Sequence, residues 1–261
     1  MENSELENYR KAGKISVEVK KYARELIKPG LPLLEIADKI EEKIKELGGK
    51  LAFPINLAIN EIAAHSTPSS DDAATAEGLL NVDIGVHVDG AIADTAFSLD
   101  LTENKEHKEL IEASEQALTN ALSIIKKGTT LSEVGSVIQE TITKAGFSPI
   151  RNLSGHELGP FLVHAGLTIP SYENNNPTPL DEGAYAIEPF STTGTGIVYD
   201  GGKSGIYRLE KQAGVRDITA RKVYQHILEN YETLPFCERW LTKKFGSRTR
   251  LSLLFLSLIH I

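Results

Sequence analysis

The chain has 261 residues, a formal net charge of −8 at pH 7 and 41% hydrophobic residues. This length and hydrophobic content exclude a disordered chain and allow one α/β domain with a large core. The negative charge argues against a nucleic-acid partner and against binding to an anionic membrane. The single cysteine, Cys237, excludes an internal disulfide, and we expect it to be buried in a protein of a reducing compartment. Because the N-terminus has no signal-peptide pattern, we expect a cytoplasmic protein without a membrane partner.

Two segments of the chain, residues 23–48 and residues 121–146, carry the same pattern. Each predicts a helix that stops at a glycine, then a second helix with one apolar stripe, and then short strands. The matching pairs are Ile27 and Ile125, Gly30 and Gly128, Leu33 and Leu131, Glu35 and Glu133, Ile40 and Ile138, and Ile44 and Ile142. This repeat predicts two halves related by a pseudo-twofold axis, with helices on a single face of one sheet.

The segment from residue 205 to residue 246 falls outside the repeat. Leu209 to Asn230 has the apolar spacing of a helix, and residues 231–236 have the composition of a loop. We therefore expect residues 1–204 to form the main domain and residues 205–246 to form part of a helical insert.

Residues 79–98 alternate between apolar and polar side chains and contain Asp89-Gly90, a strong hairpin turn signal. If these two residues form the turn, Gly85 lies opposite Asp94, and Asp83 lies diagonally beside Asp94 on the same face. The opposite face, toward the helices, then carries Val82, Ile84, Val86 and Phe97. Two carboxylates in the middle of strands are costly unless the face is wet or a metal ion compensates their charge.

Further candidate ligands follow along the chain. His156 and His164 lie in a glycine-rich stretch, Glu188 follows an apolar strand, and His65 lies in the segment Ala64-His-Ser-Thr-Pro68. Taken singly, each histidine is more often structural than functional. Taken together with the two aspartates, they predict an oxygen-rich site with imidazole, which suits Mn, Fe, Co or Zn.

These motifs resemble those of the methionine aminopeptidases, in particular the type II branch. The matching segments are Phe53-Pro-Ile-Asn56, Ala64-His65, the Asp83 and Asp94 hairpin, Gly155-His156, His164-Ala-Gly166 and Ala186-Ile-Glu188-Pro. The resemblance extends from about residue 5 to about residue 245 and includes the helical insert. It implies the α/β (α+β) pita-bread fold, whose pseudo-twofold symmetry agrees with the repeat. The short N-terminus is similar to that of the archaeal members.

The resemblance also implies a role for each candidate residue. Asp83 would bind one of two divalent ions (Co, Mn, Fe, Zn or Ni) and Asp94 would bridge both, while His156 and Glu188 would bind the second. His65 and His164 would flank the substrate as catalytic and substrate-binding residues. Two cations can activate a water molecule and polarise the scissile carbonyl. The implied substrate is the N-terminal Met of nascent polypeptides, preferably before a small second residue. We expect a monomer, and a position near the ribosome is one further expectation.

The sequence departs from the family at its end. In the family, later strands supply a last Glu that bridges both metals, and residues 247–261 match no part of that pattern. The final six residues, Leu256 to Ile261, are those that a common transposase adapter encodes in frame, so we expect residues 247–261 to be a non-native tail. We therefore expect the chain as given to be inactive or nearly so. Two alternatives are a proline-type aminopeptidase and a non-catalytic pita-bread paralogue that binds proteins or RNA.

Overall fold

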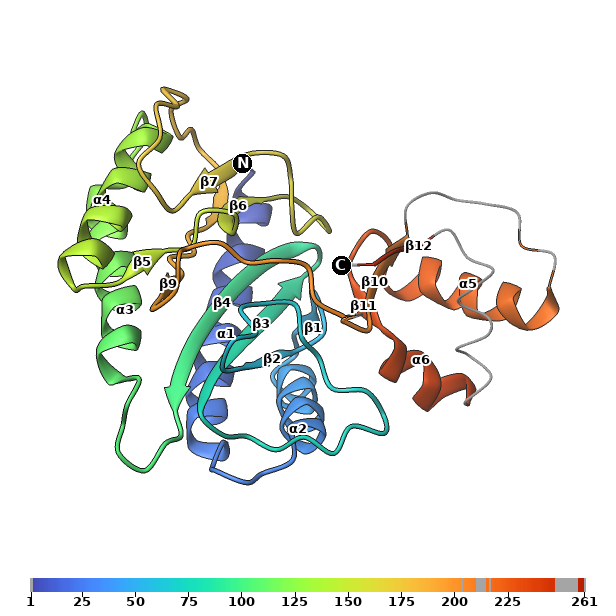
Figure 1. The fold of residues 1–261 in the computed structure, drawn as a ribbon. Coiled ribbons are helices and arrows are strands. Elements are labelled where there is room, and N and C mark those ends of the chain that lie inside the picture. The colour runs from blue at the N-terminus through green and yellow to red at the C-terminus, as the bar shows by residue number, and fades with distance from the viewer. Residues whose placement is uncertain (1, 203, 210–214, 216, 247–257, 261) are drawn as a thin grey trace. The chain divides into compact units, whose positions relative to one another are not determined.

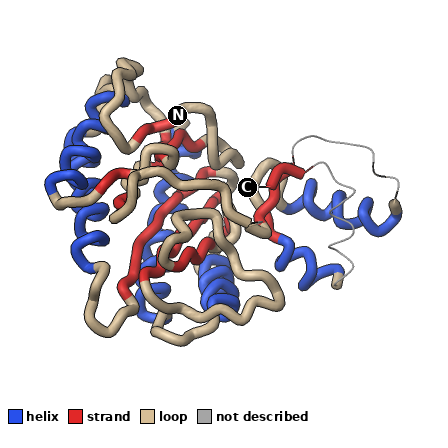
Figure 2. Tube along the Cα trace, viewed as in Figure 1, coloured by secondary structure: helices blue, strands red, loops and turns tan. Residues whose placement is uncertain are grey.

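The computed structural model describes residues 2–202, 204–209, 215, 217–246 and 258–260 (Figure 1). The helices are α1 (Asn3–Leu26), α2 (Leu33–Glu46), α3 (Lys108–Ile124), α4 (Leu131–Lys144), α5 (Ile218–Asn230) and α6 (Glu238–Phe245). The strands are β1 (Lys50–Leu51), β2 (Asn56–Ile59), β3 (Leu79–Val88), β4 (Ala91–Asp100), β5 (Ser148–Pro149), β6 (Ser154–Leu158), β7 (Thr168–Pro170), β8 (Ala184–Ala186), β9 (Ser191–Thr192), β10 (Ile206–Leu209), β11 (Phe236–Cys237) and β12 (Leu258–His260). Figure 2 distinguishes the helices, strands and loops by colour in the same view.

The chain divides into two compact units, which are described separately. The first unit contains residues 4–101, residues 160–162 and the described residues from 201 onward. The second unit contains residues 2–3, 102–159 and 163–200. Each unit holds one copy of the predicted helix-helix-strand pattern, so the repeat seen in the sequence is present in the structure. The expectation of one sheet is wrong, because the strands of the described residues pair in four separate sheets.

The first unit is built on a sheet in which β3 is the central strand. The long strand β4 pairs with one edge of β3, and the short strands β1 and β2 pair with the other edge. Helices α1 and α2 pack against one face of this sheet (Figure 1). The core between them contains Ile36, Ile40 and Ile44 of α2 and Val82, Ile84, Val86 and Phe97 of the hairpin. The predicted apolar face of the hairpin is thus confirmed.

The second unit repeats this arrangement with shorter strands. α3 and α4 pack together, β6 lies between β7 and β8, and β5 pairs with β9. α4 begins with a capping box that the sequence analysis did not identify. Thr130 Oγ1 accepts a hydrogen bond from Glu133 N at 3.2 Å, and Thr130 N donates to Glu133 Oε2 at 2.7 Å. These two bonds satisfy donors that a helix N-terminus would otherwise leave unpaired, and so fix where α4 begins.

The two equivalent turns of the repeat, at Gly30 and Gly128, differ from the prediction in one respect. Gly30 and Gly128 adopt positive φ angles of 84° and 92°, as expected for glycine. The helices before them, however, end four residues earlier, at Leu26 and Ile124. In the first copy Pro29 explains the early end, since proline restricts the residue before it and has no N–H to donate.

In the second copy a side chain ends the helix. Thr129 Oγ1 donates to Ile124 O at 3.0 Å and accepts from Lys126 N at 3.1 Å. The Thr129 hydroxyl therefore occupies a carbonyl and an N–H that the backbone would use to continue the helix. The apolar spacing of α3 gives no sign of this.

The segment after residue 204 also differs from the prediction. Leu209, expected at the beginning of a helix, ends β10, and α5 begins only at Ile218, where Asp217 Oδ1 accepts a hydrogen bond from Ala220 N at 2.7 Å. Cys237 is buried, as predicted. Of the tail expected to be non-native, residues 247–257 and residue 261 lie outside the described residues, while β12 pairs with β10. Among the helices described, none has the length and apolar character needed to cross a membrane.

His87 lies at the turn end of the β3–β4 hairpin and is buried. Its Nδ1 accepts a hydrogen bond from Gly90 N at 3.2 Å, and its ring meets the edge of Phe161 with centroids 5.4 Å apart. Burial, helped by the nearby charge of Lys50 and opposed by that of Asp89, lowers the pKa of His87 to about 4. The imidazole is therefore neutral in the folded protein at neutral pH.

We predict that His87 makes the protein less stable in acid. Its pKa is lower in the folded state than in the unfolded state, where it is about 6.5, so the unfolded state binds more protons between these values. Stability contributed by neutral His87 should be fully present above about pH 6.5 and fall by about 2 to 3 kcal/mol as the pH drops to about 4. His87→Asn keeps an acceptor but does not titrate. Urea unfolding of the metal-free proteins should show that the free energy of unfolding falls less between pH 7 and pH 4.5 in His87→Asn than in the wild type. An equal fall in the two proteins would contradict the prediction.

Candidate metal centre

The β3–β4 hairpin has the predicted register. Asp89 and Gly90 form the turn with φ angles of 47° and 87°, and Gly85 is the direct partner of Asp94. Asp83 is two residues from Gly85 and therefore lies on the same face as Asp94. Diagonal neighbours of this kind are about 7–8 Å apart at Cα, so one cation or a pair of cations can contact both carboxylates.

The surroundings of Asp83 contain a buried acceptor. Asn56 is the direct partner of Asp83 across β2 and β3, with 5% of its surface exposed. Its amide nitrogen donates to Pro54 O at 3.0 Å, while among the described residues its Oδ1 accepts no hydrogen bond. A buried acceptor without a donor commonly marks the place of a water molecule or an ion.

In the second unit, His156 and Glu188 form a close pair. His156 Nε2 lies 2.9 Å from Glu188 Oε1, with the histidine buried and the glutamate half-buried. His156 comes from β6, and Glu188 lies two residues after the end of β8, which pairs with β6. The sheet therefore brings together two side chains that are 32 positions apart in the sequence.

Two features that the sequence analysis did not identify place Glu188. Ser171 is fully buried, and its hydroxyl donates to the carbonyl of Glu188 at 2.9 Å. Gly155 allows the backbones of β6 and β8 to approach closely, because a Cβ at this position would lie 2.2 Å from Ala186 O. The one sequence signal for this approach is the glycine directly before His156.

The two histidines expected beside the substrate lie in loops. The ring of His164 meets that of His156 at a centroid separation of 4.3 Å and an angle of 72°, both in the second unit. His65 lies in the first unit, between β2 and β3, with a φ of 54°. The structure thus places Asp83 beside Asp94 in one unit, and His156, His164 and Glu188 beside one another in the other.

These residues fit the chemistry of a divalent metal. Two ligands of one ion, each about 2.1 Å from it, lie about 3.0 Å apart in octahedral and about 3.4 Å apart in tetrahedral coordination, and the 2.9 Å between His156 Nε2 and Glu188 Oε1 is close to the first value. Carboxylate oxygens with one imidazole are typical of Mn, Fe, Co and Zn sites, whereas Cys237, the single thiol, is buried elsewhere.

We predict that Gly155→Ala weakens metal binding. The added methyl group would lie 2.2 Å from Ala186 O and 3.2 Å from Glu188 N, so β8 must move away from β6 and carry Glu188 away from His156. We expect a loss of stability of about 1 to 3 kcal/mol and weaker binding of Mn²⁺. Gly194→Ala is the matched control, because its Cβ would meet only Thr192 Oγ1 at 3.4 Å. Calorimetric titration with Mn²⁺ tests this, and wild-type affinity in Gly155→Ala would refute it.

Comparison with known proteins gives the family. Residues 7–217 match the model of metallopeptidase family M24. A methionine aminopeptidase of Thermococcus kodakarensis is 47% identical over 235 residues, which cover 88% of this chain and 79% of the relative. One from Methanocaldococcus jannaschii is 44% identical over 255 residues, covering 95% of this chain and 86% of the relative.

A solved structure agrees with these relatives. The crystal structure of a methionine aminopeptidase from Thermotoga maritima aligns with a TM-score of 0.68 and 30% identity, covering 75% of this chain and 83% of that chain. The family match and the archaeal relatives agree with the carboxylate and imidazole side chains described above. The family consists of metal-dependent hydrolases with the pita-bread fold. The chain therefore belongs to the archaeal-type methionine aminopeptidases of metallopeptidase family M24.

Proposed function

We propose that the protein removes the N-terminal Met of nascent polypeptides with the help of two divalent ions, and does so best when the second residue is small. The observation that carries this proposal is the His156–Glu188 pair at 2.9 Å with the ring of His164 beside it. The names of the relatives support Met as the first residue of the substrate. The number of ions and the preference for a small second residue come from the family resemblance.

Four side chains would hold the ions. Asp83 would bind one of them, Asp94 would bridge the two, and His156 and Glu188 would bind the other. Divalent ions held in this way lower the pKa of a water molecule and polarise a carbonyl. The hairpin supplies its two carboxylates from one face, and the β6–β8 pairing holds the imidazole and the carboxylate in place before an ion binds.

The two remaining histidines would act on the substrate. His164 would donate a hydrogen bond to the oxygen on which negative charge develops, and His65 would orient the scissile amide. A ring that contacts His156 edge-on is close enough to the ligand set for this role without being a ligand itself. The monomeric state, the cytoplasmic location and a position near the ribosome are further proposals, which rest on the sequence alone.

The two neighbouring histidines allow a paired test of these roles. His156→Asn should weaken Mn²⁺ binding by about tenfold to a hundredfold or more, because a ligand is lost. His164→Asn should leave the affinity for Mn²⁺ unchanged and lower the rate of Met release. Calorimetry measures the first effect, and a coupled assay for free Met measures the second. Equal effects of the two substitutions on metal affinity would contradict the assignment.

The preference for a small second residue can be measured with peptides. As the family resemblance implies, Met-Gly-Met should release its first Met at least about tenfold faster than Met-Leu-Met in the presence of Mn²⁺ or Co²⁺, since a subsite that fits a small side chain would reject leucine. EDTA should stop the reaction. Equal rates for the two peptides would refute the preference.

If release is too slow to detect, binding of free L-methionine to the metal-loaded chain takes its place as the test of function. Absence of both release and binding would contradict the proposed function.

A further inference from the structure

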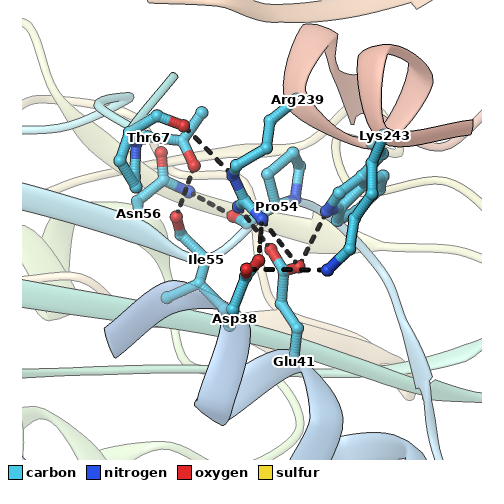
Figure 3. A network of polar contacts seen from close by, with 10 residues as sticks. Asp38, Glu41, Pro54, Ile55, Asn56, Thr67, Arg239 and Lys243 are labelled. Atoms are coloured by element: carbon cyan, nitrogen blue, oxygen red, sulfur yellow. Dashed lines mark hydrogen bonds and ion pairs between the residues drawn. The ribbon is translucent and has the colours of Figure 1, made fainter. Parts of the chain in front are cut away.

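Arg239 of α6 is buried, with 3% of its surface exposed, and its guanidinium donates hydrogen bonds to three residues (Figure 3). Nη1 and Nη2 bind Glu41 of α2 as a bidentate pair, at 3.0 Å and 2.7 Å. Nη1 also donates to Asp38 Oδ1 at 2.8 Å. Nε donates to the carbonyl of Pro68 at 3.1 Å. Because the guanidinium is planar, the two carboxylates that hold its far end also fix the direction of Nε.

The carboxylates are themselves held in place. Trp240 Nε1 donates to Glu41 Oε2 at 2.8 Å, and Lys243 Nζ lies 3.6 Å from Asp38 Oδ2. Burial lowers the pKa of the Arg239 guanidinium, but the hydrogen bonds and charge of Glu41 outweigh this effect, so that the pKa lies above its usual range. Buried ion pairs of this kind are often no more stable than apolar residues of similar size. What the pair supplies is therefore a fixed direction for Arg239 more than stability.

His65 and Pro68 lie in the same loop, between β2 and β3. Each of the three residues after His65 is anchored by a hydrogen bond. Leu57 N donates to Ser66 O at 2.6 Å. Thr67 Oγ1 donates to Ile55 O at 2.8 Å. The third anchor is the guanidinium bond to the carbonyl of Pro68. The first two anchors involve Leu57 and Ile55, in β2 and directly before it. The third involves Arg239, which lies 171 positions after Pro68 in the chain.

His65 needs such anchors because of its backbone. Its φ of 54° lies in the left-handed region, which costs a residue with a Cβ about 1 kcal/mol or more. A strained conformation of this kind persists only when the surrounding contacts determine it. The three anchors on the residues that follow are contacts of this kind, and they restrict the backbone on the C-terminal side of His65.

We propose that Arg239 is a positioning residue for His65, which it holds through the carbonyl of Pro68. In this role the helical insert is part of the substrate site, because it fixes the loop that carries a substrate-binding histidine. The role of His65 in binding Met rests on the proposed function. The claim that Arg239 fixes the position of His65 concerns the geometry of the loop alone.

Three substitutions in α6 separate positioning from stability. Arg239→Lys keeps the positive charge but removes the planar fork and the Nε donor. Trp240→Phe removes a hydrogen bond to Glu41 and costs stability, yet leaves the bond to Pro68 in place. Lys243→Met removes the other cation near Asp38 from the same helix. Urea unfolding of each variant first establishes that it is folded and how much stability it has lost.

The first measurement is the ring ¹³Cε1–¹Hε1 NMR signal of His65, which His65→Gln identifies by its absence. We expect this signal to shift in Arg239→Lys and to stay at its wild-type position in the other two variants. The second is calorimetric binding of L-methionine in the presence of Zn²⁺. Its dissociation constant should rise by about tenfold to a hundredfold in Arg239→Lys alone, as for a misplaced contact group.

An unchanged His65 signal in folded Arg239→Lys would overturn the proposal, as would an equal shift in Trp240→Phe. If Arg239→Lys does not fold, the double variant Glu41→Met with Arg239→Met replaces the whole ion pair by apolar side chains and applies the same test. If the wild-type protein neither releases Met nor binds L-methionine in the presence of Zn²⁺, the proposed function fails, while the His65 signal still decides whether Arg239 positions the loop.

Discussion

The register of the β3–β4 ladder is the constraint on which the rest of the first unit depends. Side chains alternate across a sheet with a period of two, so a slip by one residue would exchange its two faces. If β3 slipped, Val82 and Ile84 would leave the core and Asp83 would enter it, on the opposite face from Asp94. The turn at Asp89-Gly90 prevents this slip, because its two positive φ angles suit a two-residue hairpin connection. Core and candidate ligands thus depend on the same turn.

The second unit also holds candidate ligands in place, but its strands are shorter. β6, β7 and β8 contain five, three and three residues, too few for pairing alone to fix a side chain firmly. Close packing takes over this task. Gly155 lets the strands approach, and the buried Ser171 hydroxyl holds the backbone at Glu188. The His156–Glu188 pair is consequently sensitive to a change as small as one methyl group.

Much of this architecture could be predicted from the sequence, for specific reasons. The hairpin register followed from alternation together with one turn signal, and the repeat followed from apolar spacing that both copies share. The exact ends of α1 and α3 did not follow, because Pro29 and the hydroxyl of Thr129 override the apolar pattern locally. The left-handed backbone of His65 leaves no mark in a sequence. Nor does the Arg239–Glu41 pair, whose partners are 198 positions apart and belong to no shared periodic pattern.

Cys237 gives the protein a useful property for solution experiments. It is the single cysteine of the chain, has 1% of its surface exposed, and burial raises the pKa of its thiol to about 12. Alkylating reagents react with the thiolate, which is scarce at neutral pH for such a group. A cysteine introduced at an exposed helical position such as Ser123 would therefore accept a fluorophore or spin label selectively, without removal of the native thiol. Modification of Cys237 itself would then report the opening of β11 and the beginning of α6, the segment that carries Arg239.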